Sequence, residues 1–117
     1  LIMGRNNKDK DDYNITETEN LKFLTIHKSK GLEFDNTIII NLENKTNGFP
    51  SRIPNPKLLD KIIKTDSYPD EEERRLFYVA LTRSKNYTYL LVPKNTPSIF
   101  ITEIKKYGKE YIEEINL

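Results

Sequence analysis

The sequence predicts an α/β fold in which a parallel sheet is flanked by helices. Two charge-free runs, residues 37–42 and 87–92, are typical of strands that are buried on both faces. The segments between the expected strands are too long for hairpins and carry helical patterns, so consecutive strands should run parallel. A chain of 117 residues can enclose one core, and we therefore expect a single domain.

The first half of the chain is expected to hold three of the strands. Residues 1–4 indicate a short strand, and the polar, turn-rich residues 8–20 indicate a loop or a frayed helix. Residues 21–26 alternate and then run apolar, as a buried strand does, and 37–42 supply the third strand. Residues 43–56 contain a glycine and three prolines, which predicts irregular structure.

The second half is expected to be mainly helical. A group of carboxylates follows Pro69, where the dipole of a starting helix favours negative charge. The elements expected here are a short amphipathic helix at 57–64, a long helix from 69–70 to 83, a strand at 87–92, a helix capped by Ser98 and reaching about Lys106, and a short helix in the last ten residues.

Composition excludes several classes of site. The chain has no cysteine, so it can form neither a disulfide framework nor a thiolate metal site, and this fits a reducing, cytoplasmic compartment. With a single histidine, a zinc site or a Ser-His-Asp arrangement has almost no support, and we expect no metal site. The longest apolar run is far shorter than the ~20 residues that span a membrane. A net charge of +1 indicates that any contact with nucleic acid is local.

Residues 25–35, TIHKSKGLEFD, form the first segment that could carry chemistry. They follow a predicted strand, and ligands of open α/β sheets bind at the carboxyl ends of strands. The basic side chains can donate to phosphate oxygens, Glu33 can accept from a ribose hydroxyl, and Gly31 permits a sharp turn. On composition alone, a solvated basic loop is the simpler interpretation.

Residues 71–83, EEERRLFYVALTR, form the second such segment. Leu76, Val79 and Ala80 follow the spacing of one helical face, and Arg83 continues that face at the end of the helix. Arg83 therefore pairs with a carboxylate at the helix end or faces an anionic ligand. The preceding Arg75 can brace the helix by pairing with carboxylates of its first turn. Of the aromatic residues, Phe77, Tyr87 and Tyr89 are expected to pack rather than to stack on bases.

The two segments resemble motifs V and VI of superfamily 1 helicases of the UvrD/Rep type. Residues 48–50, Gly-Phe-Pro, lie where this family has its Gly-x-Phe-Pro element. Residues 2–7, IMGRNN, resemble the strand and the Arg-x-Asn that precede motif V. The resemblance covers roughly residues 1–106, and Ser29 together with the PSIF stretch at 97–100 favours the helicase IV branch.

This resemblance implies that residues 1–117 are a second RecA-like motor domain of an ATP-dependent DNA helicase. ATP with Mg²⁺ would bind between this domain and an N-terminal RecA-like domain of the same polypeptide, which would supply the phosphate loop and the metal ligands. The chain itself has no G-x-x-x-x-G-K-[ST] sequence, and it begins at Leu1 with its one methionine at position 3, so we expect a piece of a longer protein.

The resemblance also implies roles for single residues. Arg83 would be the arginine finger that reaches the γ-phosphate, and Arg75 would support the nucleotide cleft. Glu33 would contact the nucleotide sugar, with Gly31 setting the turn that presents it. Contacts with the backbone of single-stranded DNA, or the relay of domain closure to it, are implied for Thr25, His27 and Lys30, and a weaker DNA contact for Asn7.

Departures from the family pattern leave alternatives open. UvrD/Rep enzymes insert a large accessory domain before motif V, whereas only a short segment separates Arg5 from Thr25 here, so that domain is absent or trimmed. A related ATPase that remodels a protein partner, such as RNA polymerase, would carry similar motifs. A degenerate RecA-like binding module is a third interpretation, which the intact Arg83 and Glu33 disfavour.

Overall fold

The computed structural model describes residues 1–52 and 70–115. The expected helix at 57–64 lies outside these residues. The described elements, in chain order, are β1 (Ile2–Gly4), α1 (Lys8–Asp12), β2 (Phe23–Thr25), α2 (Ile26–Ser29), β3 (Phe34–Ile39), α4 (Glu71–Leu81), β4 (Ser84–Leu90), α5 (Ile99–Gly108) and the 3₁₀ turn η1 (Lys109–Tyr111).

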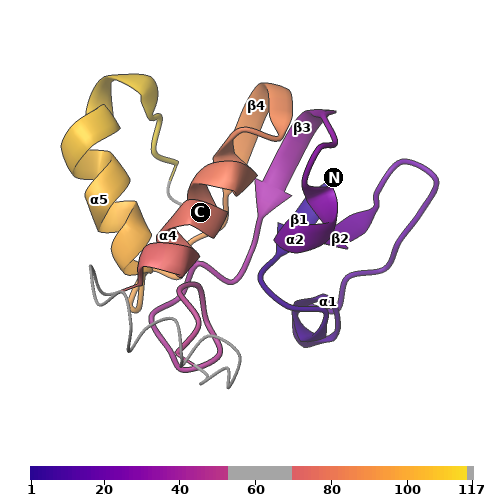
Figure 1. The fold of residues 1–117 in the computed structure, drawn as a ribbon, viewed down its shortest axis with the longest axis horizontal. Coiled ribbons are helices and arrows are strands. Elements are labelled where there is room, and N and C mark those ends of the chain that lie inside the picture. Colours follow the sequence, from indigo (N-terminus) through magenta and orange to yellow (C-terminus); the bar gives the residue numbers. More distant parts are fainter. Residues whose placement is uncertain (53–69, 116–117) are drawn as a thin grey trace.

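The four strands form one sheet in the order β2-β1-β3-β4, and every neighbouring pair is parallel. In the centre of the sheet, Ile2 of β1 is aligned with Phe23 of β2 on one side and with Ile38 of β3 on the other. The predicted parallel α/β fold is therefore confirmed. Figure 1 shows α4 and α5 beside the β3–β4 half of the sheet and α1 near β2.

The main core lies between the sheet and the helices α4 and α5. Phe77 of α4 stacks on Phe100 of α5 with ring centroids 5.0 Å apart, and Phe49 packs edge-on against both rings. All three rings are fully buried, together with Met3 and Ile39 from the central strands. This cluster fixes α4 against the sheet, and α4 carries the second of the two segments identified from the sequence.

The opposite face of the sheet is only partly covered. A smaller cluster is built from Ile2, Phe23 and Ile40 with partly buried side chains from the segment before β2. Over β4, however, Tyr87 and Tyr89 are 67% and 54% exposed. The expectation that these two tyrosines pack inside was wrong, because β4 is an edge of the described sheet and no described element covers this half of its face.

Strand boundaries differ from the expected ones for local reasons. β3 begins three residues early, at Phe34, and its first residues are exposed at the sheet margin. It stops at Ile39 because Asn41 has a left-handed backbone with φ +60°.

The final helix is capped as expected, since the Ser98 hydroxyl accepts from the N–H of Phe100. The last ten residues contain one 3₁₀ turn instead of a further α-helix among those described. Among the described residues, no helix has the length and apolarity to cross a membrane.

Candidate functional site

Two of the basic residues that follow β2, His27 and Lys28, lie on a short helix where a loop was expected, and Lys30 is the residue that ends it. Thr25 is buried and caps this helix, α2, by accepting a 3.4 Å hydrogen bond from the N–H of Lys28. The hydroxyl of buried Ser29 donates to the carbonyl of Ile26 at 2.7 Å. With one face anchored in this way, α2 presents His27 to solvent, and Lys30 is exposed at the end of the helix.

Gly31 makes the turn between α2 and β3. Its φ of +82° is a left-handed conformation that a side chain rarely adopts, and this is the role expected for it from the sequence. A Cβ at this position would meet no other atom within 4 Å, so the constraint is the backbone conformation and not the available space. Glu33, two residues on, is exposed beside the turn.

On α4, the two consecutive arginines have different partners. Arg74 binds Glu103 of α5 through its Nε and a terminal nitrogen, at 3.1 and 2.6 Å, and its guanidinium lies 5.8 Å from the centre of the Phe100 ring. The hydrogen bond from Arg74 lowers the pKa of Glu103. Arg75 instead points outward, is 66% exposed, and pairs with Glu71 and Glu72 of its own helix. The structure thus assigns Arg74 to helix packing and leaves Arg75 at the surface.

The two segments meet in a pocket of about 360 Å³. His27 comes from α2, Lys30 from the end of that helix and Arg75 from α4, while Arg5 enters from the turn after β1. The remaining lining residues are Ile26, Glu72, Glu73, Leu76 and Val79. Burial, followed by the nearby charge of Arg5, lowers the pKa of His27 below its ordinary value. Four nitrogen-bearing side chains around one hollow suit an anion such as phosphate.

Arg83 lies just beyond the end of α4, outside the set of residues that line this pocket. Its Nε donates to the carbonyl of Val79 at 3.2 Å, and its terminal nitrogens donate to the carbonyl of Leu32 at 3.2 Å and to the Thr82 hydroxyl at 3.0 Å. A guanidinium has five N–H groups, so two remain without a partner among the described residues. No carboxylate pairs with Arg83 in this part of the chain.

Asn7 is exposed at the N-terminus of α1, and its side chain makes no capping bond there. The neighbouring Arg5 was not singled out from the sequence, although it belongs to the Arg-x-Asn pattern. Arg5 forms a two-pronged ion pair with Glu73, with a shortest contact of 2.6 Å. Its partner lies 68 residues away, so no local pattern could reveal the pair.

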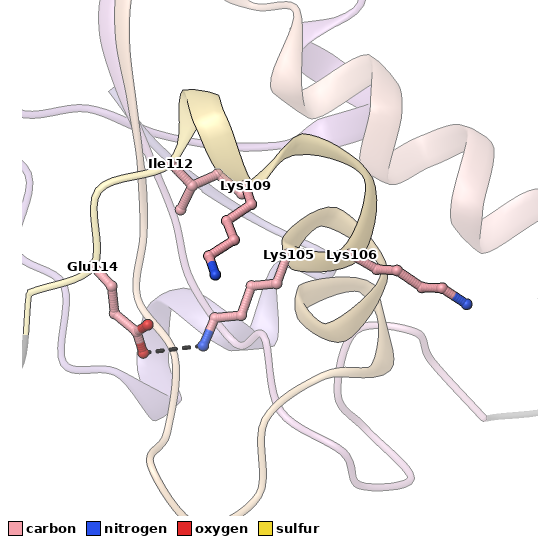
Figure 2. Close-up of a pocket in the computed structure, with 5 residues that line it drawn as sticks. All are labelled: Lys105, Lys106, Lys109, Ile112 and Glu114. Carbon is pink, nitrogen blue, oxygen red and sulfur yellow. Dashed lines mark hydrogen bonds and ion pairs between the residues drawn. The ribbon is translucent and has the colours of Figure 1, made fainter.

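A second, larger hollow of about 540 Å³ lies at the end of α5 and contains none of the predicted site residues. Its lining consists of Lys105, Lys106, Lys109, Ile112 and Glu114. Figure 2 shows Lys105 bound to Glu114, at 3.0 Å, while Lys106 points away. Lysines in the last turn of a helix offset the negative end of its dipole, which accounts for them without a ligand.

Within residues 1–52 and 70–115, no three potential ligands come together to hold a metal ion. The pocket and Arg83 thus offer donors to an anion, and the two carboxylates that line the pocket, Glu72 and Glu73, are engaged in ion pairs with Arg75 and Arg5.

A model of the UvrD-like helicase C-terminal domain family matches residues 4–95. The chain is 38% identical over 86 residues to DNA helicase IV of Escherichia coli. The aligned region covers 73% of this chain and 13% of that protein. It is 32% identical over 104 residues to the ATP-dependent DNA helicase PcrA of Staphylococcus epidermidis, with 80% of this chain and 13% of that protein covered. The chain thus spans a small part of the length of these relatives.

Proposed function

Since the chain belongs to the UvrD-like helicase C-terminal domain family, we propose that it works as the second motor domain of a cytoplasmic, ATP-dependent DNA helicase. One observation carries this proposal: His27 and Lys30 of motif V and Arg75 of motif VI line a single pocket. Two motifs that take part in the same nucleotide-driven cycle are expected to lie close together, and residues of motifs V and VI both line this pocket.

We propose that Arg83 is the arginine finger. Three hydrogen bonds to acceptors of its own domain hold the guanidinium in place, and two N–H groups are left for an incoming anion. A donor that is already oriented stabilises charge in a transition state without reorganisation at the moment of reaction. Arginine fingers contribute roughly 10³- to 10⁵-fold in related nucleotide hydrolases.

The rest of the nucleotide contact is assigned to Glu33 and Arg75. Glu33 is exposed beside the Gly31 turn, where its carboxylate can accept from a sugar hydroxyl. Arg75 is exposed enough to exchange its helix carboxylates for a phosphate oxygen. The phosphate loop and the Mg²⁺ ligands are proposed to belong to the N-terminal domain of the same polypeptide, which would dock against this surface.

Single-stranded DNA is the second proposed ligand. His27 on α2, Lys30 at the end of α2 and Asn7 at the start of α1 are all exposed. Thr25 is buried, so its proposed part is indirect: by capping α2 it sets the direction of His27 and Lys30. Binding of ATP between the domains favours the closed arrangement in which Arg83 and Glu33 gain partners, and hydrolysis removes that preference.

Turnover measured with and without single-stranded DNA tests this proposal against the alternative of an ATPase that remodels a protein partner. A polypeptide that joins this domain to its phosphate-loop domain is expected to hydrolyse ATP several times faster when an oligonucleotide is added. Turnover that is unchanged by DNA and increases with a protein partner would favour the protein-remodelling ATPase. Absence of turnover under both conditions would favour a binding module.

A further inference from the structure

We propose that Glu73 is a positioning residue: through Arg5, it holds the turn of residues 5–7 in the orientation in which Asn7 reaches single-stranded DNA. This inference rests on the proposed function, because it assumes that the turn faces the DNA. It adds a residue of motif VI, on the proposed nucleotide side, to the machinery that presents the DNA contact.

The carboxylate of Asp9 accepts hydrogen bonds from the backbone of the turn. This buried carboxylate accepts the N–H of Arg5 at 2.8 Å and the N–H of Asn6 at 3.2 Å. It also accepts a 3.0 Å hydrogen bond from the side chain of Asn41, which lies just beyond the end of β3. Asp9 therefore fixes where the turn sits on the sheet, while Asn7, with its free side chain, lies at the exposed end of the turn.

The side chain of Arg5 supplies the second attachment. Its Nε lies 2.9 Å from each carboxylate oxygen of Glu73, and a terminal nitrogen lies 2.6 Å from one of them. Only 17% of the Arg5 side chain and 13% of the Glu73 side chain are exposed. Two-pronged arginine–carboxylate contacts fix orientation as well as distance, and removal of water strengthens them.

Glu73 is itself held in place by more than its helix. One of its oxygens accepts the backbone N–H of Ser51 at 3.0 Å. The carboxylate therefore joins the turn after β1, the segment at Ser51 and the first turns of α4. Arg75 lies two residues further along α4, so a shift of this helix when Arg75 gains a phosphate would be passed directly to Arg5 and its turn.

A double-mutant cycle on single-stranded DNA affinity tests the proposal. The probe is a fluorescent oligothymidylate titrated with the 117-residue chain at low salt. In the wild type, Asn7→Ala is expected to weaken binding about two- to tenfold, the range for one hydrogen bond. In the Glu73→Gln background the turn keeps its bonds to Asp9 but loses the two-pronged attachment through Arg5, and Asn7→Ala should change binding less than about twofold.

Glu72→Gln is the matched control, because it removes the same charge from the same helix and from the lining of the same pocket. In this background Asn7→Ala should keep its full wild-type effect. An undiminished effect of Asn7→Ala in the Glu73→Gln background would overturn the proposal. If Glu73→Gln prevents folding, Arg5→Lys takes its place in the cycle, since it keeps the charge and loses the two-pronged contact.

Amide hydrogen exchange provides a readout that needs no DNA. Glu73→Gln should accelerate exchange at the amide of Asn6, which donates to Asp9, and at the amide of Lys10, which donates to the carbonyl of Asn7, while amides of β3 keep their protection. Unchanged exchange at these two amides would reject the positioning role. A wild-type chain that binds no oligonucleotide would instead count against the proposed function, and the exchange result would still decide whether Glu73 holds the turn.

Discussion

Arg83 donates a 3.2 Å hydrogen bond to the carbonyl oxygen of Leu32, which lies 51 residues earlier in the chain. This contact ties the end of the long helix α4 to the glycine turn that follows α2. Glu33 is the next residue after Leu32, so the contact also brings the proposed finger beside the proposed sugar contact. The two helicase motifs are therefore joined by a direct bond as well as by a shared pocket.

The 117-residue chain by itself is expected to show no ATP turnover. It contains no G-x-x-x-x-G-K-[ST] sequence that could cradle the phosphates, and its described residues gather no metal ligands. Phosphate release by a preparation free of contaminating ATPases would be measured with Mg²⁺ and saturating ATP. Turnover that persists after further purification would contradict the proposal that the phosphate loop and the metal ligands belong to another domain.

Lys30→Ala should weaken binding to single-stranded DNA and reduce its dependence on salt. One phosphate contact to a single strand contributes roughly 0.7 to the slope of log affinity against log salt concentration. Titrations at several salt concentrations would measure this slope. Lys28→Ala is the control, because Lys28 is equally exposed but is not a lining residue of the pocket. Equal slopes for both variants would remove the assignment of Lys30.

Phe77→Ala should destabilise the domain by about 3–5 kcal/mol, since it empties the centre of the aromatic cluster that holds α4 and α5 together. Tyr78→Ala, at the next position of the same helix, removes a side chain that is 50% exposed and should cost much less. Urea denaturation of both variants measures the difference. A similar loss of unfolding free energy in both variants would contradict the position of Phe77 at the centre of the core.

Asp9 should make the stability of the fold depend on pH. Burial raises the pKa of its carboxyl above the ordinary value of 3.8, despite the N–H groups that it accepts. The folded chain then holds this proton more tightly than the unfolded chain, so the contribution is fully present below pH 3.8 and is lost as pH rises through the raised pKa. The unfolding free energy of Asp9→Asn, relative to wild type, should rise over that interval; a difference that falls would contradict the shift.

The sequence was sufficient for the fold class and for the long helix. The cap at Ser98 and the turn at Gly31 were also predicted correctly, because each depends on one residue type at one place. The four-residue helix α2 was missed, since it is too short to show a period. Tyr87 and Tyr89 were misplaced because an uncharged strand at the sheet edge has the same composition as a buried one.

The site could be predicted only as far as its motifs. Arg74 and Arg75 are adjacent in the sequence. Only the tertiary structure shows that Arg74 binds Glu103 of α5 and that Arg75 lines the pocket. The pairing of Arg5 with Glu73 depends on the sheet bringing the turn after β1 against α4. Contacts of this kind belong to the tertiary structure, and no local pattern encodes them.

ATP turnover by Arg83→Ala, in the polypeptide that carries both motor domains, tests the central claim most directly. With saturating ATP and single-stranded DNA, kcat is expected to fall by roughly 10³-fold or more, while nucleotide affinity stays within a few-fold of wild type. Arg75→Ala, measured in parallel, should mainly weaken nucleotide affinity. Near-normal kcat for Arg83→Ala, with the large loss found in Arg75→Ala instead, would contradict the account and place the finger at position 75.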